Sequence, residues 1–595
     1  MAGRRRVFRG WVGALVVVLA AGAAAAGGAG AIKTGDLREW LTYISSDELE
    51  GRAVFTTGFG LAAGYISDHL HQWGVKPAGD RGSYLQTVRV LGVRTTSRST
   101  VSVTVNGETR TFPDGQGITF PRNMGGKRQF TVDRIEFAGY GFDAPGSSHA
   151  DFRGKDVRGA AVVWLGTSGP KNIDLNLFRR LLGGRNRYAT EQLGAAASIG
   201  PVSERAGGAG RTGGAGQAGG AGQAGQAGGA GQAGGAGQAG SAGGSGGGRG
   251  TPLPRPDFTT VQRLDLPTPP NVSADDAFFT FLFSQAPVKY DELKRLASAQ
   301  EDLPSFRVPG ATITFNVDAD YQIVRTQLTK NVVGVVEGAD PQLKSTYVAF
   351  GAHYDHVGYA EGEVTNETGP RRAGAPGRVT AGAENDRIWN GADDDGSGTV
   401  AIMALARAFA EGPKPKRSLI FVWHAGEERG LWGSRYFADY PTVPMASIVA
   451  QLNIDMIGRN RYDKASEANT VYLVGSDRIS SELHALNQAA NAAMSKPLTL
   501  DYEFNDPNDL EQIYYRSDHY SYAAKGVPII FFTTGLHRDY HANTDEVSKI
   551  EFDKMTRITQ MVYETGLRLA NLDHAPVHDN KGPRAGRLTQ SGAAQ

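Results

Sequence analysis

The C-terminal half of the chain carries five short clusters of histidine and acidic residues, the side-chain types that bind divalent metals and move protons in hydrolysis. The clusters are His353-Tyr354-Asp355, residues 390–398 (NGADDDGSG), Gly426-Glu427-Glu428, Asp455, and residues 537–541 (HRDYH). Each cluster has an ordinary explanation when taken singly, because aspartates before a helix often cap it and paired glutamates are commonly solvated. Their function therefore depends on whether the fold brings them together.

Apolar runs and helical patterns alternate from about residue 330 onwards. The runs, rich in β-branched and aromatic residues, are residues 331–336, 347–351, 419–423, 448–454, 471–474 and 529–532. Between them, apolar residues recur at helical spacing over residues 399–410, 480–494 and 552–569. This alternation predicts an α/β fold with a mostly parallel central sheet flanked by helices. In such sheets ligands bind beyond the carboxyl ends of the strands, which is where the clusters fall.

The joint placement of the clusters indicates a metal site. Burying several carboxylates together is strongly unfavourable unless cations neutralise them, and two divalent cations do this better than one. Because the chain has no cysteine, the ligands must be nitrogen and oxygen atoms. Such a ligand set favours zinc, with manganese or cobalt as alternatives.

Composition narrows the functional classes further. A chain of 595 residues with 40% hydrophobic residues is expected to build two or three cores, which excludes wholesale disorder. Lys and Arg number 62 against 61 Asp and Glu, so no global field favours nucleic acid as a partner. The absence of cysteine excludes disulfide scaffolds, thiol nucleophiles, iron–sulfur clusters and cysteine-type zinc sites.

Residues 1–31 have the order of a secretory signal peptide. Three arginines at positions 4–6 precede an apolar run over residues 11–26, and small residues offer cleavage near Ala24 and Ala26. We therefore expect a secreted, periplasmic or otherwise extracytoplasmic protein with no stable membrane span after signal removal. An uncleaved membrane anchor is the alternative, although the apolar part is shorter than the ~20 residues that a span needs.

Residues 206–250 form a low-complexity tract of near-repeats of GQAGGAG without proline. This composition cannot bury a core, so a flexible, disordered surface insert is expected. The regions around it have globular patterns. Residues 35–90 are expected to be helical and then turn-like, and short strands are predicted over residues 101–105, 130–137 and 160–165.

The motifs GAHYDH, NGADDDGSG, GEERGLWGS, NIDMIG and DYHANTDE follow one another in this order. They resemble the zinc-dependent aminopeptidase family that includes the bacterial leucyl aminopeptidases and plasma glutamate carboxypeptidase, and the resemblance covers residues 35–95 and about 326–575. It implies the phosphorylase/hydrolase-like zinc exopeptidase fold. It also implies two zinc ions bridged by a carboxylate and a water.

The resemblance assigns the metal ligands residue by residue. His353, Asp394 and Asp455 would hold one zinc ion, and Asp394, Glu428 and His541 would hold the other. Asp394 would then bridge the two ions. The family block often reads Asp-Asn where this chain has three consecutive aspartates, so a shift of the bridge by one position stays open.

The same resemblance implies a mechanism in which a metal-bridging hydroxide attacks the peptide carbonyl. Glu427 would be the general base, and Asp355 would orient the imidazole of His353. Tyr514 is similar in position to a family tyrosine that stabilises the developing oxyanion, with a packed aromatic residue as the alternative. The remaining histidines of this region are expected to line or support the site rather than bind metal: His356, His424, His519 and His537.

The sequence RIEFAGYG at 134–141 and DFRGKDV at 151–157 resemble the protease-associated domain found in exported members of the family. The expected domains are a signal peptide (1–31), an N-terminal segment of the peptidase domain (32–95), a mainly β protease-associated-like insert (96–325), the dizinc catalytic domain (326–575) and a flexible tail (576–595). The insert is interpreted either as a roof that restricts the cleft to short peptides or as a spacer.

These features predict an exported dizinc metallopeptidase that removes residues from the N-terminus of peptides. A carboxypeptidase or dipeptidase on the same dizinc centre is the alternative, because the sequence does not identify the pocket that would bind the free amine or carboxylate of the substrate. Two further classes on this fold are a non-catalytic binding protein and a one-zinc glutaminyl cyclase. The complete ligand set favours the peptidase over both.

Overall fold

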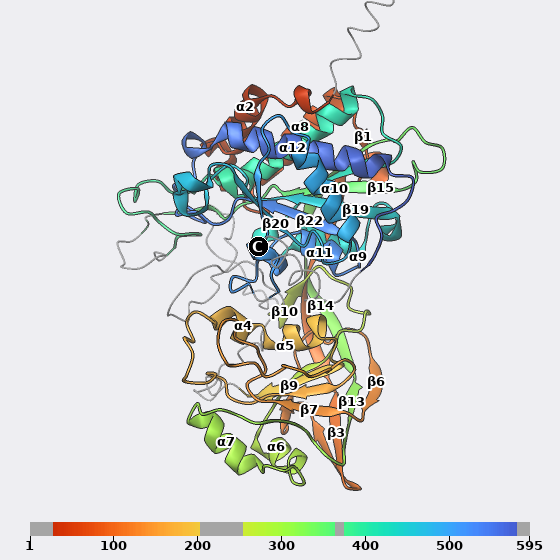
Figure 1. Cartoon of the computed structure of the whole chain (residues 1–595), viewed down its shortest axis with the longest axis vertical. Coiled ribbons are helices and arrows are strands. Elements are labelled where there is room, and N and C mark those ends of the chain that lie inside the picture. Colours follow the sequence, from red (N-terminus) through yellow and green to blue (C-terminus); the bar gives the residue numbers. More distant parts are fainter. Residues whose placement is uncertain (1–27, 203–253, 363, 365–373, 508, 580–595) are drawn as a thin grey trace, which may run out of the picture.

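The computed structural model of the chain describes residues 28–202, 254–362, 364, 374–507 and 509–579. The tract 206–250 lies outside the described residues, as does nearly all of the predicted signal peptide and tail. Figure 1 shows two lobes stacked along the long axis of the molecule. Within the described part of the chain, no helix combines the length and apolarity needed to cross a membrane.

The upper lobe is built on a ten-stranded mixed sheet of order β10-β2-β14-β18-β15-β19-β22-β20-β21, with β1 paired to β14. The strands are β1 (Lys76–Pro77), β2 (Leu85–Ser97), β10 (Phe258–Thr260), β14 (Ala319–Val336), β15 (Tyr347–His353), β18 (Ser418–His424), β19 (Ile448–Ile454), β20 (Thr470–Val474), β21 (Thr499–Asp501) and β22 (Ile529–Thr533). Only β18, β15, β19 and β22 form a continuous parallel block. The prediction of a mostly parallel sheet is not confirmed, because β2, β10, β14 and β20 add antiparallel pairings around this block.

Helices cover both faces of this sheet, which explains why its central strands read as continuous apolar runs. On one face, residues such as Phe350 and Phe421 pack against α2 (Thr34–Ile44), α3 (Thr57–Gln72), α8 (Gly398–Glu411), α10 (Ser481–Ala492) and α12 (Phe552–Asn571). On the other face, Ala349 and Val422 pack against α9 (Trp432–Asp439) and α11 (His519–Ala523). Each central strand therefore buries alternate side chains against opposite helix layers.

The lower lobe contains two smaller sheets around its own core. One has the order β4-β3-β13-β6, with β3 (Thr100–Val105), β4 (Glu108–Pro113), β6 (Arg128–Val132) and β13 (Ala311–Val317). The other has the order β12-β7-β8-β9-β11-β5, with β5 (Ile118–Thr119), β7 (Ile135–Ala138), β8 (Ala161–Val163), β9 (Ala197–Pro201), β11 (Asn271–Ala274) and β12 (Ser305–Arg307). Its helices include α4 (Arg179–Gly183), α5 (Arg185–Arg187), α6 (Asp276–Leu282) and α7 (Tyr290–Ser298). Its identification as a protease-associated domain stays a prediction.

Strands β2 and β14 connect the lobes. They pair antiparallel from Ala319 opposite Ser97 to Val332 opposite Leu85, with one irregularity between Ile323 and Arg325. The chain thus leaves the large sheet along one strand and returns along its neighbour. The predicted strand over 130–137 is divided into β6 and β7, because its two halves pair in different sheets of the lower lobe.

The parallel block places the sequence clusters at one edge. His353 ends β15, Glu427 follows β18 by three residues, and Asp455 directly follows β19. The 537–541 segment follows β22, and the acidic segment precedes α8. Since the strands of the block run parallel, their carboxyl ends meet at the same side of the sheet. The fold therefore brings the five clusters together.

Candidate metal centre

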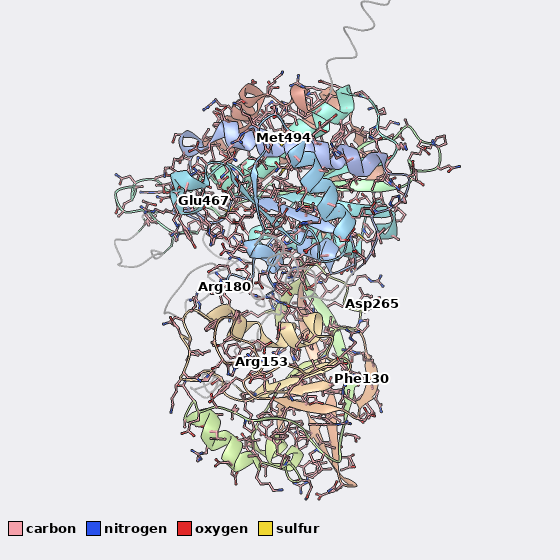
Figure 2. All side chains as sticks on the ribbon, in the orientation of Figure 1. Phe130, Arg153, Arg180, Asp265, Glu467 and Met494 are labelled. Carbon is pink, nitrogen blue, oxygen red and sulfur yellow. The ribbon has the colours of Figure 1, made fainter. Side chains whose placement is uncertain are left out.

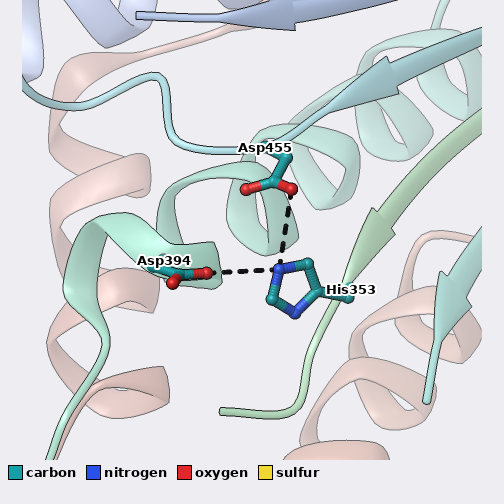
Figure 3. A group of neighbouring side chains, drawn as sticks. All are labelled: His353, Asp394 and Asp455. Carbon is teal, nitrogen blue, oxygen red and sulfur yellow. Dashed lines mark ion pairs between the residues drawn. The ribbon is translucent and has the colours of Figure 1, made fainter. Parts of the chain in front are cut away.

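His353, Asp394 and Asp455 form a buried group whose ligand atoms all lie within 4.8 Å of one another (Figure 3). The Nε2 atom of His353 is 3.3 Å from Oδ1 of Asp394 and 3.7 Å from Oδ2 of Asp455. The other ring nitrogen, Nδ1, lies 3.1 Å from the backbone carbonyl of Asp355 and 3.7 Å from its carboxylate. The contact with the carbonyl orients the imidazole so that Nε2 faces the two carboxylates.

A second group lies on the other side of Asp394. It comprises His356, Asp394 and Glu428, again with ligand atoms within 4.8 Å of one another. The Nε2 atom of His541 is 3.1 Å from Oδ2 of Asp394 and 3.0 Å from Oε2 of Glu428. Asp394 is thus shared by the two groups, and His353 and His541 approach different oxygens of its carboxylate.

His356 has a larger place in the site than sequence analysis expected. Its Nδ1 atom lies 3.0 Å from Oε1 of Glu428, and its side chain is fully buried. The sequence interpretation treated it as a lining residue because the set of five ligands was complete without it. Only the spatial arrangement shows that two imidazoles, those of His356 and His541, flank the same glutamate.

The three consecutive aspartates have separate roles. Asp394 faces both metal-ligand groups, whereas Asp393 accepts a hydrogen bond from the backbone of Gly458 and lies 3.3 Å from His537. Asp395 accepts hydrogen bonds from the backbone N–H groups of His353, Gly398 and Met456, and so joins strand β15, helix α8 and the segment after β19. The two outer aspartates therefore hold the backbone while the middle one faces the histidines.

Two glycines with left-handed backbone make this arrangement possible. Gly391 has φ +57°, and a Cβ there would lie 2.4 Å from the carbonyl oxygen of Asp394 and 2.6 Å from the ring of His356. Gly426 has φ +70° and reverses the chain directly before Glu427 and Glu428. Left-handed conformations favour glycine, which explains why the motifs have glycine at these two positions.

The chemistry of the donor set fits divalent metal. Oδ2 of Asp394, Oε1 of Glu428 and both ring nitrogens of His356 are buried without a hydrogen-bond partner among the described residues. Buried polar groups are normally paired, so a concentrated set of unpaired acceptors and imidazole nitrogens needs another partner. Their contacts of 3.0–3.9 Å lack hydrogen-bond alignment, as expected for ligands that point to a common cation.

Burial and mutual contacts shift the acid–base equilibria of the site. Burial raises the pKa of Glu427 well above its usual range. For Asp394, burial acts in the same direction, but contacts with His353 and His541 outweigh it and hold the pKa well below its usual range. In Glu428, burial is likewise outweighed, chiefly by His541, and the pKa is about 2. Asp394 and Glu428 therefore stay charged, which suits metal ligands.

Glu427 is buried beside the metal-ligand groups, with 6% of its surface exposed. Its backbone N–H donates a hydrogen bond of 3.1 Å to the carboxylate of Asp355. Asp355 thus contacts both the predicted base and, through its backbone carbonyl, the ring of His353. Its role in the structure is wider than the orientation of one imidazole.

The contacts of Tyr514 are with residues outside the two groups. The guanidinium carbon of Arg478 sits 3.7 Å from its ring centroid, and its backbone carbonyl lies 2.8 Å from Nε2 of His519. In the described part of the chain, no hydrogen bond or ion pair joins Tyr514 to the metal-ligand residues, so its role as oxyanion stabiliser stays a prediction. The other histidines contact Asp518 (His424), Phe531 (His519) and Asp393 (His537).

Sequence analysis missed Arg52, which is fully buried behind the site. Its guanidinium donates hydrogen bonds to the backbone carbonyls of Ile44 (2.6 Å), Asn390 (2.6 Å), Gly391 (2.8 Å) and Tyr354 (3.1 Å). It thereby joins the N-terminal segment to the segments that carry the first histidine and the acidic cluster. No motif spacing marks this residue, because its role depends on three segments that meet only in the fold.

Asp545 was missed for the same reason. Its carboxylate accepts hydrogen bonds from the backbone N–H groups of Asp393 and Asp394, at 3.0 Å for each closest contact. It comes from the segment that follows β22, four residues after His541. One loop therefore supplies both an imidazole for the site and the group that fixes the opposite acidic segment.

This site, with buried histidines and carboxylates at the carboxyl ends of a parallel block, defines a metallohydrolase-like centre. Residues 331–566 match the model of peptidase family M28. This match and the similarity to a leucine aminopeptidase confirm the resemblance to the zinc aminopeptidases.

Two relatives illustrate the similarity. Leucine aminopeptidase 1 of Trichophyton equinum is 25% identical over 244 residues, which cover 39% of this chain and 56% of the relative. Leupeptin-inactivating enzyme 1 of Streptomyces exfoliatus is 32% identical over 155 residues, covering 25% of this chain and 31% of the relative. The chain therefore spans about half the length of the first relative and about a third of the second.

Among solved structures, an aminopeptidase from Aneurinibacillus sp. strain AM-1 aligns with 93% of this chain and 98% of its own, at 17% identity and a TM-score of 0.40. A zinc aminopeptidase from Bacillus subtilis aligns with 92% of this chain and 99% of its own, at 14% identity and the same TM-score of 0.40.

Replacing Arg52 by methionine is expected to destabilise the fold strongly. The change removes the Arg52 donor from four buried carbonyl groups. The carbonyl of Gly391 keeps the N–H of Gly396 as a donor, whereas the other three lose their donor, and each such group costs about 1–3 kcal/mol. We expect R52M to lose at least about 3 kcal/mol of unfolding free energy in urea titrations, and R52K to lose less because an ammonium replaces some of the bonds. An R52M variant within about 1 kcal/mol of the wild type would contradict this role.

Zinc uptake by the metal-free protein is expected to release protons at pH 7. Burial disfavours the charged form of His353 and of His541, but neighbouring carboxylates outweigh it and raise both pKa values well above the usual range. Because ligation requires neutral imidazole, zinc binding displaces about two protons, one from each of these histidines. For the same reason the apparent zinc affinity rises with pH until both histidines are neutral in the metal-free protein. A pH indicator in weak buffer measures the release. We expect the H541A variant to release about one proton fewer than the wild type. The variant H574A, which changes an exposed histidine, is the control and should release as many protons as the wild type.

Proposed function

We propose that this protein is an exported dizinc aminopeptidase that hydrolyses the N-terminal peptide bond of peptides. The observation that carries the proposal is the position of Asp394, whose carboxylate is shared by two buried groups of histidines and acids. Two cations on either side of one carboxylate would neutralise a cluster that is otherwise unfavourable to bury. The family match of residues 331–566 supports the same chemistry.

In this proposal each metal has its own ligand set. His353, Asp394 and Asp455 would hold one zinc, and Asp394, Glu428 and His541 the other, with manganese or cobalt as alternatives. His356 offers a further imidazole next to Glu428. When bound, such a pair of cations lowers the pKa of water and withdraws charge from the scissile carbonyl.

Glu427 would act as the general base. Its carboxylate would accept the proton of the attacking water and return it to the departing amine. Burial raises the pKa of this carboxyl, which makes it a stronger base for the first of these two proton transfers. Asp355 fixes the backbone of this residue, and Tyr514 remains the candidate donor to the carbonyl oxygen.

Two further parts of the proposal, export of the protein and cleavage at the N-terminus of the substrate, have their own support. Export follows from the signal-like order of residues 1–31. Cleavage at the N-terminus is supported by the leucine aminopeptidase relative, while a carboxypeptidase or dipeptidase would use the same ligands. Hydrolysis of a peptide but not of its N-acetylated form would establish the aminopeptidase, and the reverse preference would exclude it.

The variant E427Q tests the role of Glu427. Glutamine keeps the size of the side chain but cannot accept the proton, so we expect turnover of amino-acid p-nitroanilides to fall about 100-fold or more while zinc content is unchanged. E411Q changes a half-exposed glutamate at the end of α8 and serves as the matched control. Near-normal turnover by E427Q would exclude Glu427 as the base, and chelator-insensitive turnover by the wild type would exclude a metallopeptidase.

A further inference from the structure

The lower lobe makes polar and cation–π contacts with a short segment of the upper lobe, residues 511–520. Nε of Arg180 in α4 is 3.0 Å from the carboxylate of Glu511, and Figure 2 places Arg180 at the junction of the two lobes. The guanidinium carbon of Arg187 lies 3.9 Å above the ring of Tyr515. The third contact is a hydrogen bond from the hydroxyl of Tyr520 to Glu191.

The same segment contacts the first metal-ligand group. Oγ of Ser517 donates a hydrogen bond of 2.7 Å to Oδ2 of Asp455. The amide of Asn453, on β19, donates to this Oγ at 3.2 Å, so the hydroxyl hydrogen is left for the carboxylate. Ser517 thereby fixes the orientation of a carboxylate whose Oδ2 also faces His353.

The segment reaches the second group through Arg516. This guanidinium lies 3.1 Å from the carboxylate of Glu511 and 3.5 Å from the hydroxyl of Tyr540. The ring of Tyr540 stacks on the ring of His541, with centroids 4.0 Å apart and planes inclined by 24°. An uninterrupted series of contacts thus leads from Arg180 in the lower lobe to the imidazole next to Glu428.

The segment contacts the lower lobe on one side and the residues of the metal centre on the other. Residues 511, 515 and 520 face the lower lobe, whereas residues 516 and 517 face the metal-ligand groups. The segment includes the short helix Ile513–Tyr515 and the first residues of α11 (His519–Ala523), and such short helices have few internal hydrogen bonds to fix their position. Its place is therefore determined by what packs on either side.

We propose that the lower lobe is a positioning element of the metal centre, acting through Arg180, Arg187 and Glu191 on residues 511–520. The predicted effect on catalysis rests on the proposed function, whereas the predicted effect on zinc affinity does not depend on it. In this role the lobe fixes the orientation of Asp455 and His541, one ligand from each group. It is thus neither a spacer nor only a roof over the cleft.

The effect expected from each substitution depends on how exposed the ion pair that it removes is to solvent. The side chains of Arg180 and Glu511 are 22% and 43% exposed, and such partly solvated ion pairs contribute little singly. We expect R180Q to lower kcat about 5-fold, and the triple variant R180Q/R187Q/E191Q to lower it about 30-fold or more. Zinc affinity of the triple variant is expected to fall about 10-fold, the lower end of the effect seen when groups that support metal ligands are removed.

The experiment uses the full chain and measures kcat, KM and zinc affinity by chelator competition. K294Q, which removes an ion pair with Asp276 between α7 and α6, is the control because those helices lie at the far end of the lower lobe (Figure 1). A fall in kcat and in zinc affinity, with KM little changed, supports the proposal. A change in KM alone, or no change, overturns it.

A second measurement covers the case in which the triple variant fails to fold. The single variants R180Q and E511Q and their combination form a double-mutant cycle, and R180K should restore part of the lost kcat. Coupling of the two residues in zinc affinity supports the proposal, whereas strict additivity overturns it. If the wild-type protein binds zinc but hydrolyses no peptide, the proposed function fails, while the cycle in zinc affinity still tests the positioning role.

Discussion

The structure depends on the neutralisation of carboxylates that are buried together. Asp394, Asp395, Glu427 and Asp455 are each almost inaccessible to solvent. One carboxylate oxygen of Asp394 and one of Glu428 have no hydrogen-bond partner within the part of the chain that the structure describes. Burial of this kind is unfavourable without positive charge. The parallel block of strands, the two left-handed glycines and the buried Arg52 all serve to hold these groups in one place.

Much of this arrangement was predictable from the sequence, because burial on both faces leaves a clear signal. Strand β19 coincides with the predicted run 448–454. Helix α8 extends its predicted range by one residue at each end, and α12 begins at the predicted residue and extends two residues further. The order of the motifs along the chain also located the strand ends correctly. Strand β2 and the first part of β14 gave no such signal, because most of their residues are exposed or half-exposed and the apolar pattern is diluted. Only the buried end of β14 was predicted, as the run 331–336.

The roles of individual residues were harder to predict from the sequence. Asp393, Asp394 and Asp395 are identical in type, and only the structure shows that the outer two bind backbone groups while the middle one faces the histidines. His356 and Arg52 act through segments that are distant in sequence. Such roles are properties of three-dimensional proximity, which residue spacing along one segment does not encode.

The pairing of β2 with β14 has a consequence for how the chain folds. Residues 98–318 separate these two neighbouring strands, so a disordered connection of that length would oppose their pairing with an entropy cost of about 5 kcal/mol. A lower lobe that folds early holds the two strand ends side by side and removes most of that cost. Its presence in the middle of the chain then assists assembly of the large sheet, because the folded lobe replaces a long disordered connection between β2 and β14.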